Sequence, residues 1–185
     1  MWITNTLTGC IVGLSVAIRL NYVSVQALKL SYYAIQKRHE YYRLFTCLIC
    51  WDHLSMGVLF QTYVFWQFSS SFESSVYNKK PMQYLFGIFV LAVSILSQGF
   101  MFKEARYPLL ADIFMNGLST WWSRVARDSP VSFYGLTLKA GYLPFAGLCI
   151  QFLYNGELAA KRCFLGILAG LTSHVFLTSR MTGGI

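Results

Sequence analysis

Long apolar stretches alternate with short polar connections along the whole chain. A run of about 20 apolar residues is long enough to cross a bilayer as a helix. By this measure the sequence predicts six transmembrane helices, over residues 2–28, 44–68, 83–102, 107–123, 132–154 and 159–178. These helices fill the chain, so we expect an all-α polytopic membrane protein that forms one domain over residues 1–185, with no soluble domain.

The composition agrees with this interpretation, because 56% of the residues are hydrophobic and 12% are charged, whereas about a quarter are charged in soluble domains. The net charge is +8, but the basic residues lie mostly between the apolar runs, as they do in loops that flank membrane spans. We therefore expect no nucleic-acid partner. The N-terminus lacks the basic region and the cleavage site of a signal peptide, so we interpret it as the first span.

The five cysteines lie in or near apolar stretches, where cysteine behaves as a small hydrophobic residue. Cys47 and Cys50 form a C-x-x-C motif, but a zinc site needs a second pair of ligands, and none has the right spacing. The sequence therefore predicts no disulfide framework, no metal site and no cofactor.

Lysine and arginine are unequally distributed between two sets of predicted loops. Eight occupy one set, at positions 29, 37, 38, 43, 103, 106, 161 and 162, and five occupy the other, at 79, 80, 124, 127 and 180. The positive-inside rule places the first set in the cytosol or the mitochondrial matrix, with both termini on the opposite side.

Ionisable residues inside a membrane span are costly and usually face the interior of the helix bundle or a water-filled cavity. Lys139 is one of them, and it either snorkels to the interface or pairs with Asp52 or Asp112. Each such residue is a candidate for function: Arg19, Asp52, His53, Asp112, Lys139 and His174.

Two regular patterns occur on predicted helices in the second half of the chain. On the fourth span, polar residues with spacings of four, three and four share one face. They are Asp112, Asn116, Ser119 and Ser123. On the sixth span, Gly166, Gly170 and His174 are four residues apart, and such a small-residue pattern lets another helix backbone approach closely.

Ser119 and His174 form the candidate pair for an intramembrane serine protease, in which an imidazole takes the hydroxyl proton and nearby donors stabilise the oxyanion. The sequence "NGLST" contains a G-x-S around Ser119. The alternative is that both residues belong to interhelical hydrogen-bonding faces and have no catalytic role.

The stretch from Trp121 to Phe145 joins a charged connection to an apolar run. Trp121 and Trp122 fit an aromatic belt at the membrane interface, and Pro130 favours the first turn of the next helix. Pro144 falls inside the predicted fifth span, where a proline removes a backbone donor and clashes with the preceding turn. We therefore expect a hinge at the membrane surface followed by an interrupted fifth helix.

Several motifs follow one another in a specific order. "EYYRLFT" precedes "YVFWQFSSSFESSVYNKKPMQYLF", and "WWSRVARD", "VSFYG" and "KAGYLPF" come later. Together they resemble the derlins, which are rhomboid-like proteins without protease activity. Derlins start the second helix with W-R-x-x-T and have "YLPW" in the fifth; here Tyr42 takes the tryptophan position and Arg43 is kept. The likeness covers about residues 29–180.

The resemblance assigns further positions. Glu73 matches the glutamate of the family's leucine–glutamate pair, with Phe72 in place of the leucine, and His174 resembles the family's closing glycine–histidine. The motif residues implied by the resemblance are Tyr42, Arg43, Glu73, Trp122, Ser123, Arg124, Tyr142, Leu143, Pro144 and His174.

The resemblance also implies that the chain is not a protease. Counted back from Trp122, a rhomboid nucleophile falls near Ala111, where no G-x-S-G occurs. Gln61 stands where rhomboids place an oxyanion-binding asparagine, and Gly57 stands where they place a histidine. Three of four catalytic positions are therefore unfilled, and we expect no hydrolysis.

For a derlin, the family implies a location in the endoplasmic reticulum membrane and a role in moving misfolded proteins back to the cytosol. The implied partners are membrane lipids, a ubiquitin ligase complex and an AAA ATPase. A polar lateral groove would lower the cost of moving a hydrophilic chain through lipid. The candidate groove residues are Asp52, Gln61, Asp112, Asn116, Ser119 and Lys139.

Two departures from the family keep a second hypothesis open. The sequence ends at "SRMTGGI", without the long cytosolic tail of many derlins, and its charge bias favours the opposite orientation. The alternative is a rhomboid-like scaffold or accessory subunit of a larger complex, such as a translocase or a respiratory complex of the mitochondrial inner membrane. In that case, a lipid or a partner subunit would cover the polar face.

Overall fold

The computed structural model describes residues 2–51, 56–75, 81–101, 109–133 and 136–182, and these residues are mostly helical. Contacts group the chain into two compact units. The first contains residues 1–85 and 99–111, and the second contains residues 86–98 and 112–185. The long helix α6 (Pro81–Met101) contributes residues to both units.

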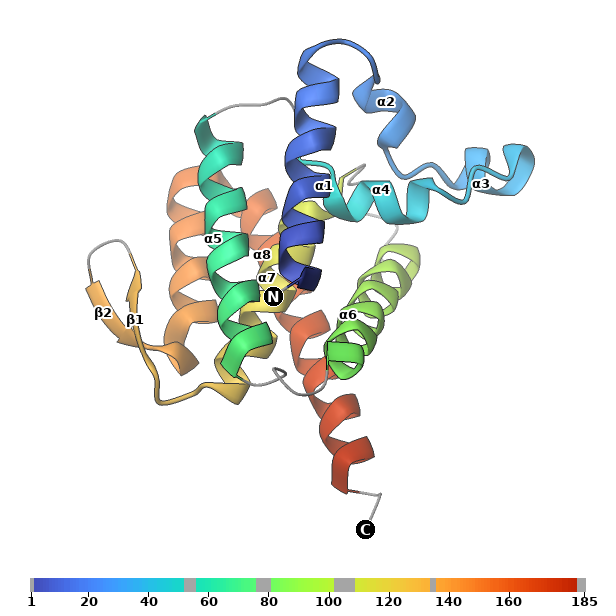
Figure 1. The fold of residues 1–185 in the computed structure, drawn as a ribbon. Helices are drawn as coiled ribbons and strands as arrows, with labels where there is room; N and C mark the ends of the chain where they lie inside the picture. Colours follow the sequence, from blue (N-terminus) through green and yellow to red (C-terminus); the bar gives the residue numbers. More distant parts are fainter. Residues whose placement is uncertain (1, 52–55, 76–80, 102–108, 134–135, 183–185) are drawn as a thin grey trace. The chain divides into compact units, whose positions relative to one another are not determined.

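The first unit is built on α1 (Trp2–Arg19) and α5 (Met56–Ser75), which lie side by side (Figure 1). Arg19 in the last turn of α1 complements the negative end of the helix dipole. Just beyond it, Asn21 has a φ of 60°, a left-handed conformation that commonly ends a helix.

Three short helices follow α1 in the first unit: α2 (Val25–Leu28), α3 (Tyr32–Arg38) and α4 (Arg43–Ile49). The hydroxyls of Ser24 and Ser31 cap α2 and α3 by accepting hydrogen bonds from backbone N–H groups in the first turn. Ile18, Leu28 and Cys50 form a buried cluster that holds the end of α1 against these short helices.

The second unit contains α7 (Ala111–Val125), a β-hairpin, the 3₁₀ helix η1 (Ala140–Tyr142) and α8 (Leu143–Thr182). Strand β1 (Pro130–Phe133) pairs antiparallel with β2 (Leu136–Lys139), with Pro130 opposite Lys139. Gly156 interrupts α8 with a φ of 76° and a ψ of −171°, a conformation that is essentially restricted to glycine. The two halves of α8 therefore run as separate helices, seen in orange and red in Figure 1.

Two of the described helices are long and apolar enough to cross a membrane, over residues 81–98 and 156–179. They correspond to the predicted third and sixth spans. A shorter apolar helical stretch covers residues 140–153. Across the described residues, α1, α5 and α7 do not meet the same test of length and apolarity.

The prediction of a purely helical chain is wrong at the predicted fifth span, because residues 130–133 and 136–139 form paired strands. In "PVSF" and "LTLK" apolar and polar residues alternate with a period of two, which is typical of strands. The predicted second span is also divided, because α4 ends at Ile49 and Cys50 is extended, with a φ of −82° and a ψ of 116°.

Candidate functional site

The polar face predicted on α7 satisfies its own hydrogen bonds. Asn116 Nδ2 donates to the carbonyl oxygen of Asp112 at 2.9 Å, and Ser119 Oγ donates to that of Asn116 at 2.9 Å. Thr120 Oγ1 also donates to Asn116 O at 2.7 Å, and Ser123 Oγ donates to Thr120 O at 2.7 Å. Each hydroxyl proton is thus held by a backbone carbonyl one turn earlier.

The glycine positions on α8 lie against this same helix. A Cβ atom on Gly170 would meet the carbonyl oxygen of Gly117 at 2.5 Å and Thr120 Cβ at 2.8 Å. A Cβ atom on Gly166 would meet Ile113 O and Asn116 Cβ, both at 2.7 Å. The backbones of α7 and α8 therefore approach so closely that only glycine fits at these two positions.

The serine and histidine of the protease hypothesis are not joined. Ser119 Oγ donates to its own helix, and no hydrogen bond among the described residues links it to His174. The backbone oxygen of His174 accepts the hydroxyl proton of Thr178 at 2.8 Å. A nucleophilic serine needs a base within hydrogen-bonding distance, and this arrangement does not provide it.

Asp112 pairs with an arginine that the sequence did not single out. Its Oδ2 lies 3.9 Å from Arg162 Nη1, and the two side chains are 43% and 30% exposed. Because Arg162 lies inside the apolar stretch 156–179, the pair places two opposite charges next to a helix long enough to cross a membrane. The sequence signal for it was Arg162 itself, at the start of the predicted sixth span.

Lys139 lies outside the proposed groove. It is the last residue of β2, 67% exposed, and its Nζ is 3.8 Å from the Asp128 carboxylate. The expectation of a lysine within a helical fifth span is therefore wrong, and the described ion pair of Lys139 is with Asp128. The hairpin turns the chain back so that Lys139 reaches the acidic residue that precedes the first strand.

The candidate groove residues are divided between the two units and the part of the chain outside the described residues. Asp112, Asn116 and Ser119 share a face of α7 in the second unit. Gln61 belongs to α5 in the first unit. Asp52, like His53, lies outside the described residues.

The motif residue Arg43 ties three segments of the first unit together. Its Nη1 donates to the carbonyl oxygens of Gln26 and Lys29, each at 3.0 Å, and its Nε donates to the Glu40 carboxylate at 2.5 Å. The guanidinium also lies over the Tyr42 ring, 5.7 Å from its centroid. Arginine can bridge several acceptors because its planar fork has five N–H donors.

The motif residue Glu73 caps the N-terminus of α1, which begins at Trp2, far from Glu73 in the sequence. Its carboxylate accepts from the backbone N–H groups of Ile3, at 3.3 Å, and Thr4, at 3.0 Å, and from Thr4 Oγ1 at 2.7 Å. Glu73 is 3% exposed. A helix N-terminus has unpaired N–H groups and a partial positive charge, so this buried carboxylate is compensated where it lies.

Two more hydroxyls extend this arrangement into a chain. Ser69 Oγ lies 2.9 Å from Thr4 Oγ1 and 2.6 Å from the hydroxyl of Tyr84, and all three residues are fully buried. Thr4 has one hydroxyl proton, which goes to the carboxylate, so Ser69 must donate to Thr4 and Tyr84 to Ser69. Thr4, Ser69, Tyr84 and Glu73 are called the hydroxyl chain below. Sequence reasoning found only Glu73, since the other members are far apart in the sequence.

The two tryptophans of "WWSRVARD" lie inside the protein. Trp121 is 1% exposed and Trp122 is 6% exposed, so the expected aromatic belt at the membrane interface is wrong. A Cβ atom on Gly87 would come within 2.1 Å of the Trp121 ring, so the indole fills the space that this glycine leaves on α6. Ser123 is fully buried, whereas Arg124 is exposed.

The "YLPF" element starts a helix and does not interrupt one. Leu143 is buried and begins α8, with Pro144 in the first turn and Tyr142, 64% exposed, just before it. A proline is well tolerated there because N–H groups of the first turn have no intrahelical partner. The preceding residues are in a strand and in the single 3₁₀ turn of η1, so Pro144 does not lie inside a continuous α-helix. Pro130 likewise begins β1 and no helix.

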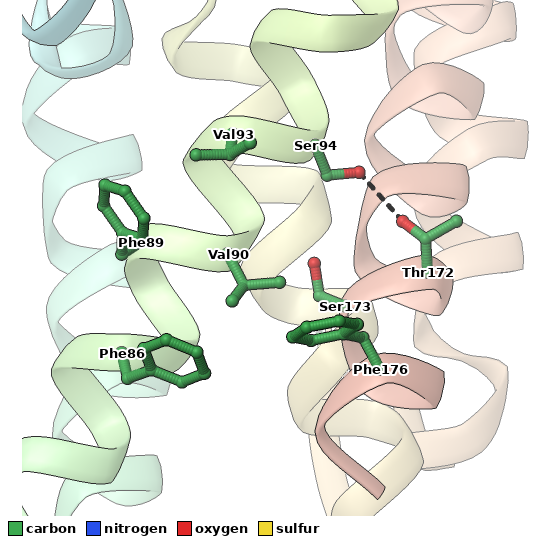
Figure 2. A pocket seen from close by; sticks show the side chains of 8 residues that line it. All are labelled: Phe86, Phe89, Val90, Val93, Ser94, Thr172, Ser173 and Phe176. Carbon is green, nitrogen blue, oxygen red and sulfur yellow. Dashed lines mark hydrogen bonds between the residues drawn. The ribbon is translucent and has the colours of Figure 1, made fainter. Parts of the chain in front are cut away.

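A groove lies between α6 and α8 in the second unit (Figure 2). Its volume is about 390 Å³, and it was not anticipated from the sequence. The residues that line it are Phe86, Phe89, Val90, Val93, Ser94, Thr172, Ser173 and Phe176. Among the described residues no group of three or more metal-ligating side chains is found.

Comparison with known proteins gives one consistent result. Residues 2–183 match the model of the Der1-like family. The chain is 30% identical over 169 residues to the probable derlin-2 homolog of Dictyostelium discoideum, which covers 89% of the chain and 65% of that protein. It is 26% identical over 179 residues to Derlin-1 of Drosophila melanogaster, covering 95% and 69%. The chain therefore spans about two thirds of the length of these relatives.

Proposed function

The chain belongs to the Der1-like family, and from this premise we propose that it helps misfolded proteins leave the endoplasmic reticulum. The match over residues 2–183 is the observation that supports the proposal. As a derlin-like membrane protein, it would have the six spans expected from the sequence. The names of its relatives favour this role over that of a mitochondrial complex subunit.

The proposed role does not require the protein to cleave its clients. The Ser119 hydroxyl proton is held by the Asn116 carbonyl, and Thr120 donates to the same oxygen. Without a base that competes for this proton, the serine is an ordinary weak nucleophile. The polar atoms of α7 therefore contribute to packing and to the polarity of the helix surface, and the protein acts on clients by binding and guiding them.

The proposed surface for the client is the Asp112–Arg162 pair. Both side chains are partly exposed, and an ionisable pair at membrane depth usually lines a polar path. Such a pair offers a hydrogen-bond donor, the guanidinium, and a hydrogen-bond acceptor, the carboxylate, to a client backbone that crosses the membrane. We place the polar lateral groove at this pair and at the adjoining face of α7.

Removal of this pair tests the groove. In the double variant Asp112→Leu with Arg162→Leu, both charges are lost together, so neither is left buried alone, and the fold should be kept or stabilised. The measurement is the degradation rate of a misfolded membrane client in a chase after translation is blocked. This rate should fall by a factor of about three or more, which corresponds to a loss of roughly 0.7 kcal/mol of interaction with the client.

The second ion pair of α8 provides a matched control. Glu157 and Lys161 lie 2.9 Å apart and are both largely exposed, so their double replacement by leucine also removes two opposite charges. Client degradation should be unchanged in that variant. If the unmodified chain and the two double variants are expressed equally and degrade the client at the same rate, the groove at Asp112 and Arg162 is ruled out.

Location and partners are tested separately. We propose the endoplasmic reticulum membrane, with a ubiquitin ligase complex and an AAA ATPase as partners. The tagged chain should co-localise with endoplasmic reticulum markers and co-purify with ligase subunits. Recovery with mitochondrial translocase or respiratory subunits would overturn the proposed role and support the accessory-subunit hypothesis.

A further inference from the structure

We propose that the groove between α6 and α8 binds one acyl chain of a membrane lipid. The inference does not depend on the client role, because it concerns a different surface from the Asp112–Arg162 pair. It starts from the position of the groove. All of its lining residues on α6 lie within residues 81–98, and those on α8 lie within residues 156–179.

These two stretches are the helices long enough and apolar enough to cross a bilayer. A groove whose two walls are such helices opens into hydrocarbon and is not exposed to water. An empty apolar groove would deprive its lining of van der Waals contacts, and apolar cavities do not hold ordered water. Hydrocarbon chains are the material that surrounds it.

The polar atoms of the lining offer nothing to a polar ligand. Thr172 Oγ1 donates to Ala169 O at 3.0 Å, so Ser94 must donate its own proton to Thr172, which lies 2.8 Å away. Ser173 Oγ donates to Ala169 O at 2.7 Å. The three hydroxyl protons are therefore all in use, and the lining contains no charged residue. A headgroup or an extended peptide would find no donor here.

The shape of the lining favours a slender chain over a third helix. Where helices of this protein approach closely, as α7 and α8 do, the contact is made by Gly117, Gly166 and Gly170. The groove instead has the rings of Phe86 and Phe176 on its two walls, with Val90 between them (Figure 2). Bulky side chains keep another helix backbone at a distance, whereas a flexible acyl chain can lie between them.

The size is consistent with one such chain. A volume of about 390 Å³ lies at the lower end of the range of roughly 300–1,000 Å³ found for small-molecule sites. An acyl chain in a membrane has already left water, so it gains only van der Waals contact with the ordered walls of the groove. We therefore expect selective retention of a lipid, and not irreversible binding.

The experiment uses the full chain in lipid nanodiscs of phosphatidylcholine that include a photoactivatable phosphatidylcholine with a diazirine on one acyl chain. After irradiation, peptides covering residues 86–94 and 172–176 should be labelled. The variant Val90→Trp fills the groove, and labelling of these peptides should fall about tenfold, which corresponds to roughly 1.4 kcal/mol. Val93→Trp gives the same test from a neighbouring position if Val90→Trp does not fold.

Val175→Trp is the matched control. Val175 is on α8, is 66% exposed and does not line the groove, so the same substitution there should leave the labelling unchanged. Native mass spectrometry of the detergent-purified chain distinguishes the source, because a bound phospholipid and a bound fatty acid differ in mass, and either supports the proposal. Equal labelling of all variants, or a groove protected by a second copy of the chain, would overturn it.

Discussion

The hydroxyl chain of the first unit and the α7–α8 contact of the second satisfy buried polar groups in opposite ways. In the hydroxyl chain, every hydrogen bond joins residues that are distant in sequence. The buried Glu73 carboxylate accepts at one end and so sets the direction of donation along the chain. On α7, the side chains of Asn116, Ser119, Thr120 and Ser123 all donate to the backbone of their own helix. The helix surface is then smooth enough for glycines of α8 to touch it.

The difference indicates where specificity is located in each unit. In the first unit, polar pairing between helices specifies their positions, because a misplaced helix would leave the Glu73 charge unpaired. In the second unit, shape specifies the glycine-lined part of the contact, because hydrogen bonds within α7 give no preference for a partner; the partly exposed Asp112–Arg162 pair adds a polar link between the two helices. Three substitutions separate these two modes, and each has a control in the same chain.

The largest effect is expected from Gly170→Ala. The new Cβ atom would lie 2.5 Å from a backbone oxygen of α7, and backbone cannot move aside as a flexible side chain can. The α7–α8 contact should open at a cost of about 3 kcal/mol, measured as a lower free energy of unfolding in detergent.

Gly147→Ala is the control for this substitution. Gly147 is also on α8, and a Cβ atom there meets nothing within 4 Å. Alanine should stabilise that part of the helix by up to about 1 kcal/mol. If both variants unfold alike, shape complementarity is not what specifies the second unit.

The next effect is expected from Glu73→Ala, which removes the acceptor at the head of the hydroxyl chain. Two backbone N–H groups and the Thr4 hydroxyl would lose their partner while buried. We expect a loss of about 2 kcal/mol, with increased hydrogen exchange at the first turn of α1. Glu157→Ala, at an exposed position, should change the unfolding transition little. A normal exchange rate at Ile3 and Thr4 in the Glu73 variant would contradict the capping role.

The smallest effect is expected from Ser119→Ala, and it tests the comparison most directly when paired with Ser69→Ala. Ser119 bonds only within α7 in the described structure, so its loss should cost no more than about 0.5 kcal/mol. Ser69 links two other hydroxyls, and its loss should cost about 1–2 kcal/mol. Client cleavage that disappears with Ser119→Ala would revive the protease hypothesis.

Local patterns predicted the elements whose formation depends on nearby residues. The helices predicted at 83–102 and 107–123 agree in position with α6 and α7 within a few residues, and of these two α6 also meets the test for a membrane span. The spacing of Gly166 and Gly170 predicts a close contact, and the structure shows that α7 is the partner. The family resemblance singled out Arg43 and Glu73, which the structure places at the joints of the first unit. What these residues do there was not predictable, because their partners are separated from them in sequence.

The predictions for the fifth span, Lys139 and Trp121 are wrong because each rests on one local property of the sequence, and another property or a distant contact determines the structure. Residues 132–139 are apolar enough to be predicted as the start of the fifth span, although the alternation in "PVSF" and "LTLK" is typical of strands. The pairing of Lys139 with Asp128 depends on the hairpin, so a sequence prediction that places a helix there does not predict the pair. Trp121 was assigned to the interface by its type, but the space beside Gly87 determines its position.

The hydrogen bonds within α7 also have a consequence for the order in which the protein is made. A nascent chain enters the membrane from its N-terminal end, and earlier segments fold first. When α7 emerges, α8 does not yet exist, and a helix with unpaired hydroxyls would have to wait in lipid for a partner. Because its hydroxyls already bond to its own backbone, they need no partner helix during insertion, whereas Asp112 meets Arg162 only once α8 is present. The first unit differs, because the donors at the start of α1 are synthesised before Glu73, the carboxylate that pairs with them.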